Sequence, residues 1–250
     1  LMRTPVMAGN WKMYKTAAET TAFFEAFGSL VAGASDRDIV ICPTFVNIPA
    51  AVEATKGSNV QIGGQNLYWA KEGAFTGEIS GPMLTAVGAK WVIIGHSERR
   101  QYFGETDETV LKRTQAALEA GLNPIVCVGE RLEERESGRT NAVLEEQFNG
   151  GIAGLSPEQF SKIAIAYEPV WAIGTGKTAT PEIAAEAHAH IRSLVNGQFG
   201  ADAGSKARIL YGGSVKPDNV KTLMAKEDLD GVLVGGASLD AKSFAAIVNF

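Results

Sequence analysis

Short runs of apolar and often β-branched residues recur along the chain, separated by longer segments in which apolar and polar positions are mixed. The runs are nearly continuous in hydrophobicity rather than alternating, which is typical of parallel strands covered on both faces. Runs of this kind span residues 6–8, 39–42, 60–62, 91–94, 125–128, 163–167, 209–211 and 232–234. The pattern therefore predicts eight buried strands.

The longer segments between these runs carry helical patterns. Predicted helices cover residues 16–30, 106–120, 132–148, 181–195, 217–224 and 238–248. Phe23 and Phe27 belong to an apolar stripe in the first of them, and Gly121 is placed to end the second. Thr180 followed by Pro181 is typical of a helix start. Strand and helix thus alternate along the chain.

Eight strand-then-helix units within 250 residues match the count and size of a (β/α)8 barrel. A doubly wound open sheet is the structural alternative. Because no linker, low-complexity stretch or change of composition divides the chain, we expect one α/β domain over residues 1–250. In a closed barrel with parallel strands, the chemistry lies at the C-terminal ends of the strands.

The composition of the chain argues against several classes of protein. The formal net charge is -5, which gives no reason to expect non-specific binding to nucleic acid or to an anionic membrane. No apolar run approaches the roughly 20 residues of a membrane span, and residues 1–5 contain no apolar leader. Cys42 and Cys127 both lie within strand-like runs, as buried reduced thiols would. These features predict a cytoplasmic protein.

Glu168 closes the sixth apolar run and is followed at once by a segment with the composition of a lid. Pro169 to Trp171 stiffen the exit, and residues 172–176, Ala-Ile-Gly-Thr-Gly, form an adaptable tip before Lys177. Glu is rarely buried without a partner. A Glu at a strand end under a mobile flap is a candidate general base, whereas a solvated strand-terminal residue is the alternative.

Candidate active-site residues also follow two further predicted strands. Asn10 and Lys12 follow the first strand, where Lys12 supplies positive charge at the mouth of an otherwise acidic protein. His96 follows the fourth strand, and a helical turn starting at Ser97 would lower its pKa and keep the imidazole neutral. His188 and His190 are expected on a helix surface. A surface lysine and a structural histidine remain the alternatives.

Two glycine-rich turns follow the last two strands. Gly212-Gly213-Ser214 and Gly235-Gly236 leave backbone N–H groups open to approach, and each precedes a predicted helix. Barrels commonly hold phosphate at these loops. The pair predicts a phosphate-binding cradle, although a single Gly-Gly turn would indicate only a tight bend. The sequence contains no metal-ligand cluster.

The motifs together resemble the triosephosphate isomerase family. The similarity runs in order through residues 9–12 (GNWK), 95–100 (GHSERR), 167–177 (YEPVWAIGTGK), 211–215 (YGGSV) and 235–237 (GGA). The lid segment and the His-Ser-Glu-Arg-Arg run are highly specific, and the resemblance covers essentially the whole chain. It implies a TIM barrel.

The resemblance also implies an activity and roles for individual residues. The activity is the cofactor-free interconversion of D-glyceraldehyde 3-phosphate and dihydroxyacetone phosphate in glycolysis and gluconeogenesis. Glu168 would be the base and His96 the electrophile, with Asn10 and Lys12 binding the triose. Phosphate contacts would come from Gly174, Ser214, Gly235 and Gly236, and the lid would comprise Pro169, Val170, Trp171, Ala172, Ile173, Gly174, Thr175, Gly176 and Lys177.

A long aromatic loop, residues 65–78, suggests a subunit interface. Packing of this loop on its own barrel is the alternative. The resemblance favours a homodimer, in which Phe75 and Thr76 reach the partner near Met13 and Tyr14. Other phosphosugar barrels, such as epimerases or aldolases, and a non-catalytic phosphate-binding barrel remain the functional alternatives.

Overall fold

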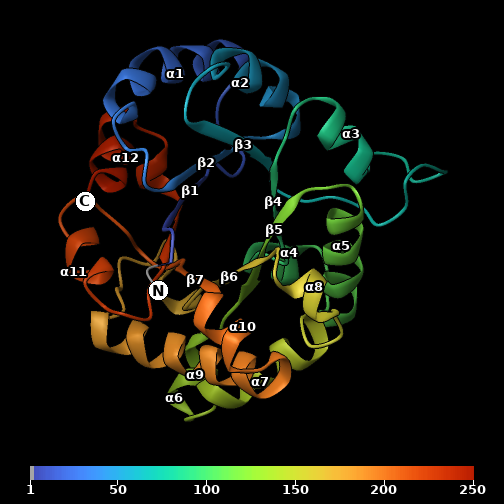
Figure 1. The fold of residues 1–250 in the computed structure, drawn as a ribbon, viewed down its shortest axis with the longest axis vertical. Helices are drawn as coiled ribbons and strands as arrows, with labels where there is room; N and C mark the ends of the chain where they lie inside the picture. The colour runs from blue at the N-terminus through green and yellow to red at the C-terminus, as the bar shows by residue number, and fades with distance from the viewer. Residues whose placement is uncertain (1–2) are drawn as a thin grey trace.

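The computed structural model describes residues 3–250 and shows a closed ring of parallel strands surrounded by helices (Figure 1). Leu1 and Met2 lie outside the described residues. Neighbouring strands pair in sequence order, and β1 pairs with β8 to close the barrel. The predicted parallel (β/α)8 TIM barrel is confirmed, and the open sheet is excluded.

All eight predicted strands are present, with ends that differ from the predictions by two residues at most. They are β1 Val6–Asn10, β2 Asp38–Cys42, β3 Val60–Gly64, β4 Trp91–Ile94, β5 Asn123–Val128, β6 Ala164–Tyr167, β7 Arg208–Tyr211 and β8 Gly231–Val234. Side chains in these strands are almost all buried, because the barrel interior covers one face and the helices cover the other.

The helices alternate with the strands and include several short elements. They are α1 Ala17–Val31, η1 Phe45–Asn47, α2 Ile48–Ala54, α3 Gly81–Ala86, α4 Ser97–Tyr102, α5 Asp107–Glu119, α6 Leu132–Glu136, α7 Thr140–Gly151, α8 Pro157–Phe160, η2 Val170–Ala172, α9 Pro181–Phe199, α10 Ala201–Lys206, α11 Val220–Met224, η3 Gly236–Ser238 and α12 Ala241–Val248. The predictions missed the short helices α2, α3, α8 and α10, whose few residues give little periodicity.

Helix starts follow the local sequence. Thr16 and Glu19 form a reciprocal capping box at α1. Thr180 accepts a hydrogen bond from the Ile183 N–H at the start of α9, where Pro181 occupies the first turn as predicted. These contacts satisfy backbone donors that have no partner within the helix.

Three predicted helices differ from the structure. The segment 132–148 is not one helix, because Gly138 adopts a left-handed φ of 73° and ends α6 before α7 begins. The segment 217–224 is helical only from Val220, after a turn, and the segment 238–248 is helical only from Ala241. At these ends, the local preference for a turn determines where the helix stops or starts, and the periodic pattern does not reveal it.

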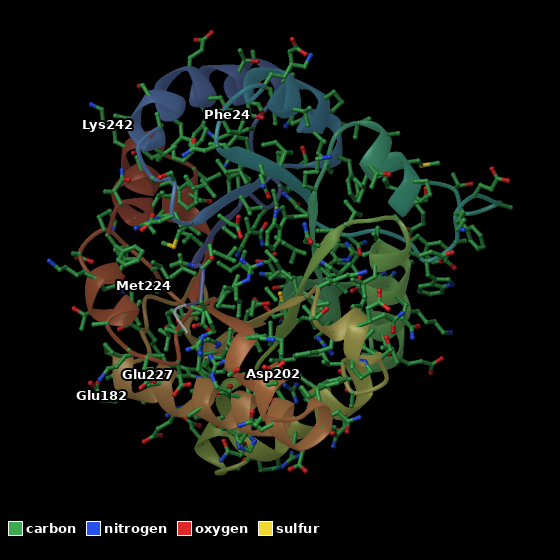
Figure 2. The ribbon with its side chains drawn as sticks, viewed as in Figure 1. Phe24, Glu182, Asp202, Met224, Glu227 and Lys242 are labelled. Carbon is green, nitrogen blue, oxygen red and sulfur yellow. The ribbon has the colours of Figure 1, made fainter. Side chains whose placement is uncertain are left out.

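Side chains fill both the barrel interior and the layer between strands and helices (Figure 2). The interior is built mainly from small and medium residues, including both cysteines, together with the large side chain of Trp91. Phe24 on α1 is buried in the outer layer, whereas Lys242 on α12 is exposed. The thiols of Cys42 and Cys127 are free and buried as predicted, and burial raises the pKa of Cys42 to about 12.

The predicted surface position of His188 is wrong. The side chain is fully buried on the inner face of α9, where Nδ1 lies 3.1 Å from the carbonyl oxygen of Asp228. The ring meets Tyr167 edge-on. Burial lowers the pKa of His188 to about 4, so the imidazole is neutral at pH 7.

Candidate active site

A cavity of about 230 Å³ opens at the carboxyl ends of the strands and collects most of the predicted site residues. Its wall is formed by loops that follow β1, β4, β6, β7 and β8. The predicted residues on this wall are Asn10, Lys12, His96, Ala172, Ile173, Gly174, Ser214, Gly235 and Gly236. Residues more than 200 positions apart in the sequence therefore meet around one cavity.

Lys12 is held in an unusual backbone conformation at the mouth of the barrel. Its φ is 51°, in the left-handed region that non-glycine residues rarely adopt. The Asn10 side chain accepts a hydrogen bond from the Lys12 N–H at 2.9 Å, and Gln65 donates to the Lys12 carbonyl at 2.8 Å. Nζ of Lys12 forms an ion pair of 2.7 Å with Glu98. This strained backbone conformation thus places the Lys12 ammonium group on the wall of the cavity.

His96 is the residue immediately before α4, which begins at Ser97 as the sequence indicated. The backbone N–H of Glu98 donates to Nδ1 of His96 at 3.1 Å. An N–H aimed at Nδ1 requires a lone pair there, so Nε2 carries the proton of the neutral ring. The expected contact between the helix terminus and the imidazole is therefore present.

The direction of the expected pKa shift at His96 is wrong. Burial lowers the pKa, but the negative charge of Glu168, its hydrogen bond to His96 and the charge of Glu98 raise it by more. Nε2 of His96 lies only 3.0 Å from Oε2 of Glu168. No motif in the sequence predicts that the carboxylate contacts the ring directly, and this contact reverses the direction of the pKa shift.

Glu168 is 1% exposed and accepts a hydrogen bond from the Ser97 hydroxyl at 3.1 Å. Burial raises the pKa of the carboxyl group, but His96, Cys127 and Ser97 hold it below its usual value. Oε1 of Glu168 is buried and has no hydrogen-bond partner among residues 3–250. One carboxylate oxygen is thus held in place while the other has an unused lone pair.

Glycines allow the chain to pass close to this glutamate. A Cβ atom on Gly129 would lie 1.7 Å from the Glu168 carbonyl oxygen, and one on Gly212 would lie 2.9 Å from its Cγ atom. Both positions therefore require glycine for steric reasons. Glu168 itself is not part of the cavity wall, so its carboxylate must turn from Ser97 to reach a ligand there.

The predicted phosphate turns lie on the cavity wall, but their relation to helices differs from the expectation. Gly235 and Gly236 lead into the short turn η3, as predicted. Ser214 lies six residues before α11, so no helix terminus faces it directly. The carboxamide of Asn219 instead fixes this loop, accepting from the Lys216 N–H at 2.8 Å and donating to the Ser214 carbonyl at 3.0 Å.

The lid segment after Glu168 is anchored at its base. Its first part forms η2, and the indole N–H of Trp171 donates to Glu130 at 3.1 Å. The tip contains Gly174 and Gly176, whose φ values are 66° and 76°. The hydroxyl of Thr175 donates to the Trp171 carbonyl at 2.7 Å. The geometry is that of a loop with a fixed base and an exposed tip.

Sequence reasoning missed several supporting residues. Ser97 and Glu98 belong to the GHSERR motif at residues 95–100. The motif alone does not predict that Ser97 contacts Glu168 or that Glu98 pairs with Lys12. Glu130 is fully buried and accepts hydrogen bonds from Tyr167 and Trp171, yet its loop had no distinctive motif. Side-chain contacts of this kind become interpretable only once the neighbours in the folded chain are known.

The residues predicted at a subunit interface lie outside the cavity. Met13 is 90% exposed and Tyr14, Phe75 and Thr76 are also exposed. Phe75 packs on Tyr68 with ring centroids 4.6 Å apart, so the loop also makes contacts within its own chain. Figure 1 shows the segment between β3 and α3 projecting beyond the ring of helices.

Within residues 3–250, neither a cluster of metal ligands nor a membrane-spanning helix is found. No group of three or more His, Cys, Asp or Glu side chains is arranged to hold a metal ion. The helices described there are all too short or too polar to cross a membrane.

Comparison with known proteins gives a consistent result. The family model described as "Triosephosphate isomerase" matches residues 5–250. Curated proteins of that name from Solibacter usitatus and Citrifermentans bemidjiense are 70% and 56% identical over 249 residues, covering 100% of this chain and 100% and 99% of theirs. The crystal structure of triosephosphate isomerase from Bartonella henselae superposes with a TM-score of 0.88 at 41% identity, covering 98% of each chain.

Proposed function

Because the chain belongs to the triosephosphate isomerase family, we propose that Glu168, His96 and Lys12 carry out the reaction of that family. The enzyme is an aldose–ketose isomerase that interconverts D-glyceraldehyde 3-phosphate and dihydroxyacetone phosphate, a step of glycolysis and gluconeogenesis. The observation that carries the assignment of roles is the 3.0 Å contact between Glu168 and His96 beside a cavity lined by Lys12.

The reaction moves a proton between adjacent carbons, and Glu168 is the base that removes it. The carboxylate turns from Ser97 toward the cavity and uses the oxygen that has no partner, Oε1. The product of this step is an enediolate, whose developing negative charge needs stabilisation. A proton also passes from one enediolate oxygen to the other, and the same carboxyl group, now protonated, returns its proton to the neighbouring carbon, so no redox partner is consumed.

His96 and Lys12 stabilise the enediolate oxygens. The Glu98 N–H on Nδ1 favours the neutral tautomer of His96 with its proton on Nε2, which can donate to a substrate oxygen. Lys12 adds positive charge, and fixed groups act more strongly in a dry pocket than in water. A carboxylate base, a neutral imidazole and a closing loop are the established arrangement of this family.

Backbone and hydroxyl groups on the opposite side of the cavity bind the phosphate. Gly235 and Gly236 present open backbone at η3, while Ser214 and Gly174 contribute from the β7 loop and the lid. Closure of residues 169–177 over the phosphate would then exclude water from Glu168 and Lys12. Binding energy from the phosphate, which does not react, drives this closure.

The assembly is a homodimer in this proposal. The exposed apolar side chains of Met13, Tyr14 and Phe75 support it, because such surface is unfavourable in water. Thr76 at the tip of the projecting loop would contact the partner. The location is the cytoplasm, which is supported by two buried thiols and no disulfide among residues 3–250.

A coupled assay on D-glyceraldehyde 3-phosphate tests the function, together with NMR of the substrate in D2O. Turnover with deuterium entering at the carbon beside the carbonyl supports the isomerase. Binding without exchange would indicate a phosphate-binding barrel, and loss of activity with EDTA would indicate a metal-dependent epimerase or aldolase. Either of these results would overturn the proposal.

A further inference from the structure

Lys216 lies on the wall of the same cavity, and neither the predicted site nor the proposed mechanism uses it. It follows Ser214 in the β7 loop and shares the cavity wall with Lys12 and Gly235. Its side chain is exposed at the entrance rather than buried within the barrel. A second cation therefore stands beside the residues proposed to bind phosphate.

The two lysines of the cavity wall differ in their partners. Lys12 is paired with Glu98 at 2.7 Å, so part of its charge is already compensated. Within residues 3–250, Nζ of Lys216 takes part in no ion pair or hydrogen bond; its neighbour Asp218 forms no ion pair with it. The charge of Lys216 is thus available to an approaching anion.

The backbone beneath Lys216 is fixed, although its side chain is free. Asn219 bridges the Lys216 N–H and the Ser214 carbonyl, and the intervening Val215 is 4% exposed. The loop therefore holds the backbone of Lys216 next to the proposed phosphate site, whichever rotamer the side chain adopts. This position differs from that of an ordinary surface lysine on a helix.

We propose that Lys216 recruits the substrate: its ammonium group attracts the phosphate dianion to the cavity and raises the rate of association. The inference rests on the proposed function. A chain with a net charge of -5 repels a dianion at long range, so local positive charge decides the potential at the entrance. An exposed charge of this kind acts mainly on association and is screened by salt beyond about 8 Å at physiological ionic strength.

The test compares Lys216→Gln with Lys221→Gln, which removes the same charge from an exposed position on α11 away from the cavity wall. We expect kcat/KM of Lys216→Gln to fall roughly two- to fivefold at about 10 mM ionic strength and to converge with wild type near 0.5 M salt. Lys221→Gln should stay close to wild type, and Lys216→Arg should restore the rate. Equal values for the two Gln variants would overturn the proposal.

A second measurement separates recruitment from chemistry and from the proposed function. Stopped-flow fluorescence of Trp171 follows the association of glycerol 3-phosphate, a triose-sized phosphate that does not isomerise. Slower association of Lys216→Gln at low salt supports recruitment even if the isomerase assay fails. An unchanged association rate would contradict it, as would a loss of kcat that is independent of salt.

Discussion

Nε2 of His96 lies 3.0 Å from Oε2 of Glu168, so the proposed base and the proposed hydrogen-bond donor contact each other directly. A substrate oxygen that accepts from Nε2 must take the place of this carboxylate. The same rotation frees Glu168 to reach a carbon atom. It also removes the charge that raises the pKa of His96, so the ring becomes neutral more readily in the substrate complex.

The acid limb of the pH profile reports protonation of the coupled pair of Glu168 and His96 in the free enzyme. Burial raises the pKa of the Glu168 carboxyl group, whereas His96, Cys127 and Ser97 together lower it below its usual value. Activity is therefore retained until the pH falls through this lowered pKa. Ser97→Ala removes one stabilising hydrogen bond, so the acid limb of kcat/KM should move to higher pH.

This shift is measured by kcat/KM across the acid range, with Ser205→Ala as a surface control. Because His96 and Glu168 are coupled, the limb belongs to the pair rather than to one residue. A limb that stayed in place or moved to lower pH would mean that Ser97 does not stabilise the ionised base.

Replacing Lys12 by alanine should damage binding and turnover together. The ammonium group is placed to attract the substrate anion and to stabilise the enediolate, so KM should rise and kcat/KM should fall at least about 100-fold. Steady-state kinetics measure both, with Lys56→Ala as a control for loss of an exposed lysine. Kinetics like those of wild type would leave Lys12 with no role in the reaction.

Most of the barrel follows from local pattern, because buried parallel strands are continuous apolar runs and each one here was recognisable. Helix ends were less predictable, since Gly138 interrupts a charge-rich helical pattern that otherwise continues from α6 into α7. His188 shows a related limit: a single polar residue on a helix carries no sign of its burial against Asp228.

The positions of the site residues could be predicted for a similar reason, since strand ends of a parallel barrel converge. The contacts between individual side chains of the site could not be predicted, because they depend on side-chain rotamers and on loops that follow distant strands. The contact of Glu168 with His96 crosses 72 positions of sequence and reverses the pKa direction expected for the histidine.

Trimming the lid tip, residues 172–176, should release more inorganic phosphate per turnover. An enediolate next to a phosphate ester can expel the phosphate, and the lid is proposed to hold the intermediate in a conformation that prevents this. Phosphate release is compared with isomerisation in the same sample, and Thr178→Ala serves as a control with an intact tip. A product ratio equal to that of wild type would refute the containment role.

Placing arginine at position 76 should separate the proposed dimer. Thr76→Arg adds charge and bulk at an exposed loop tip, where burial in an interface would leave the new charge without solvent. Analytical ultracentrifugation should show a lower mass than for Thr21→Arg, which carries the same change on the exposed face of α1. A Thr76→Arg dimer as stable as the control dimer would exclude this loop from the interface.

The most direct test of the account is kcat for Glu168→Asp. Shortening the side chain by one methylene group withdraws the carboxylate by roughly an ångström while keeping its charge, and such misplacement lowers rates about 100-fold. We predict a fall of at least about that size, with KM little changed and a circular dichroism spectrum like that of wild type. A folded variant with near-normal kcat would show that Glu168 does not move the proton.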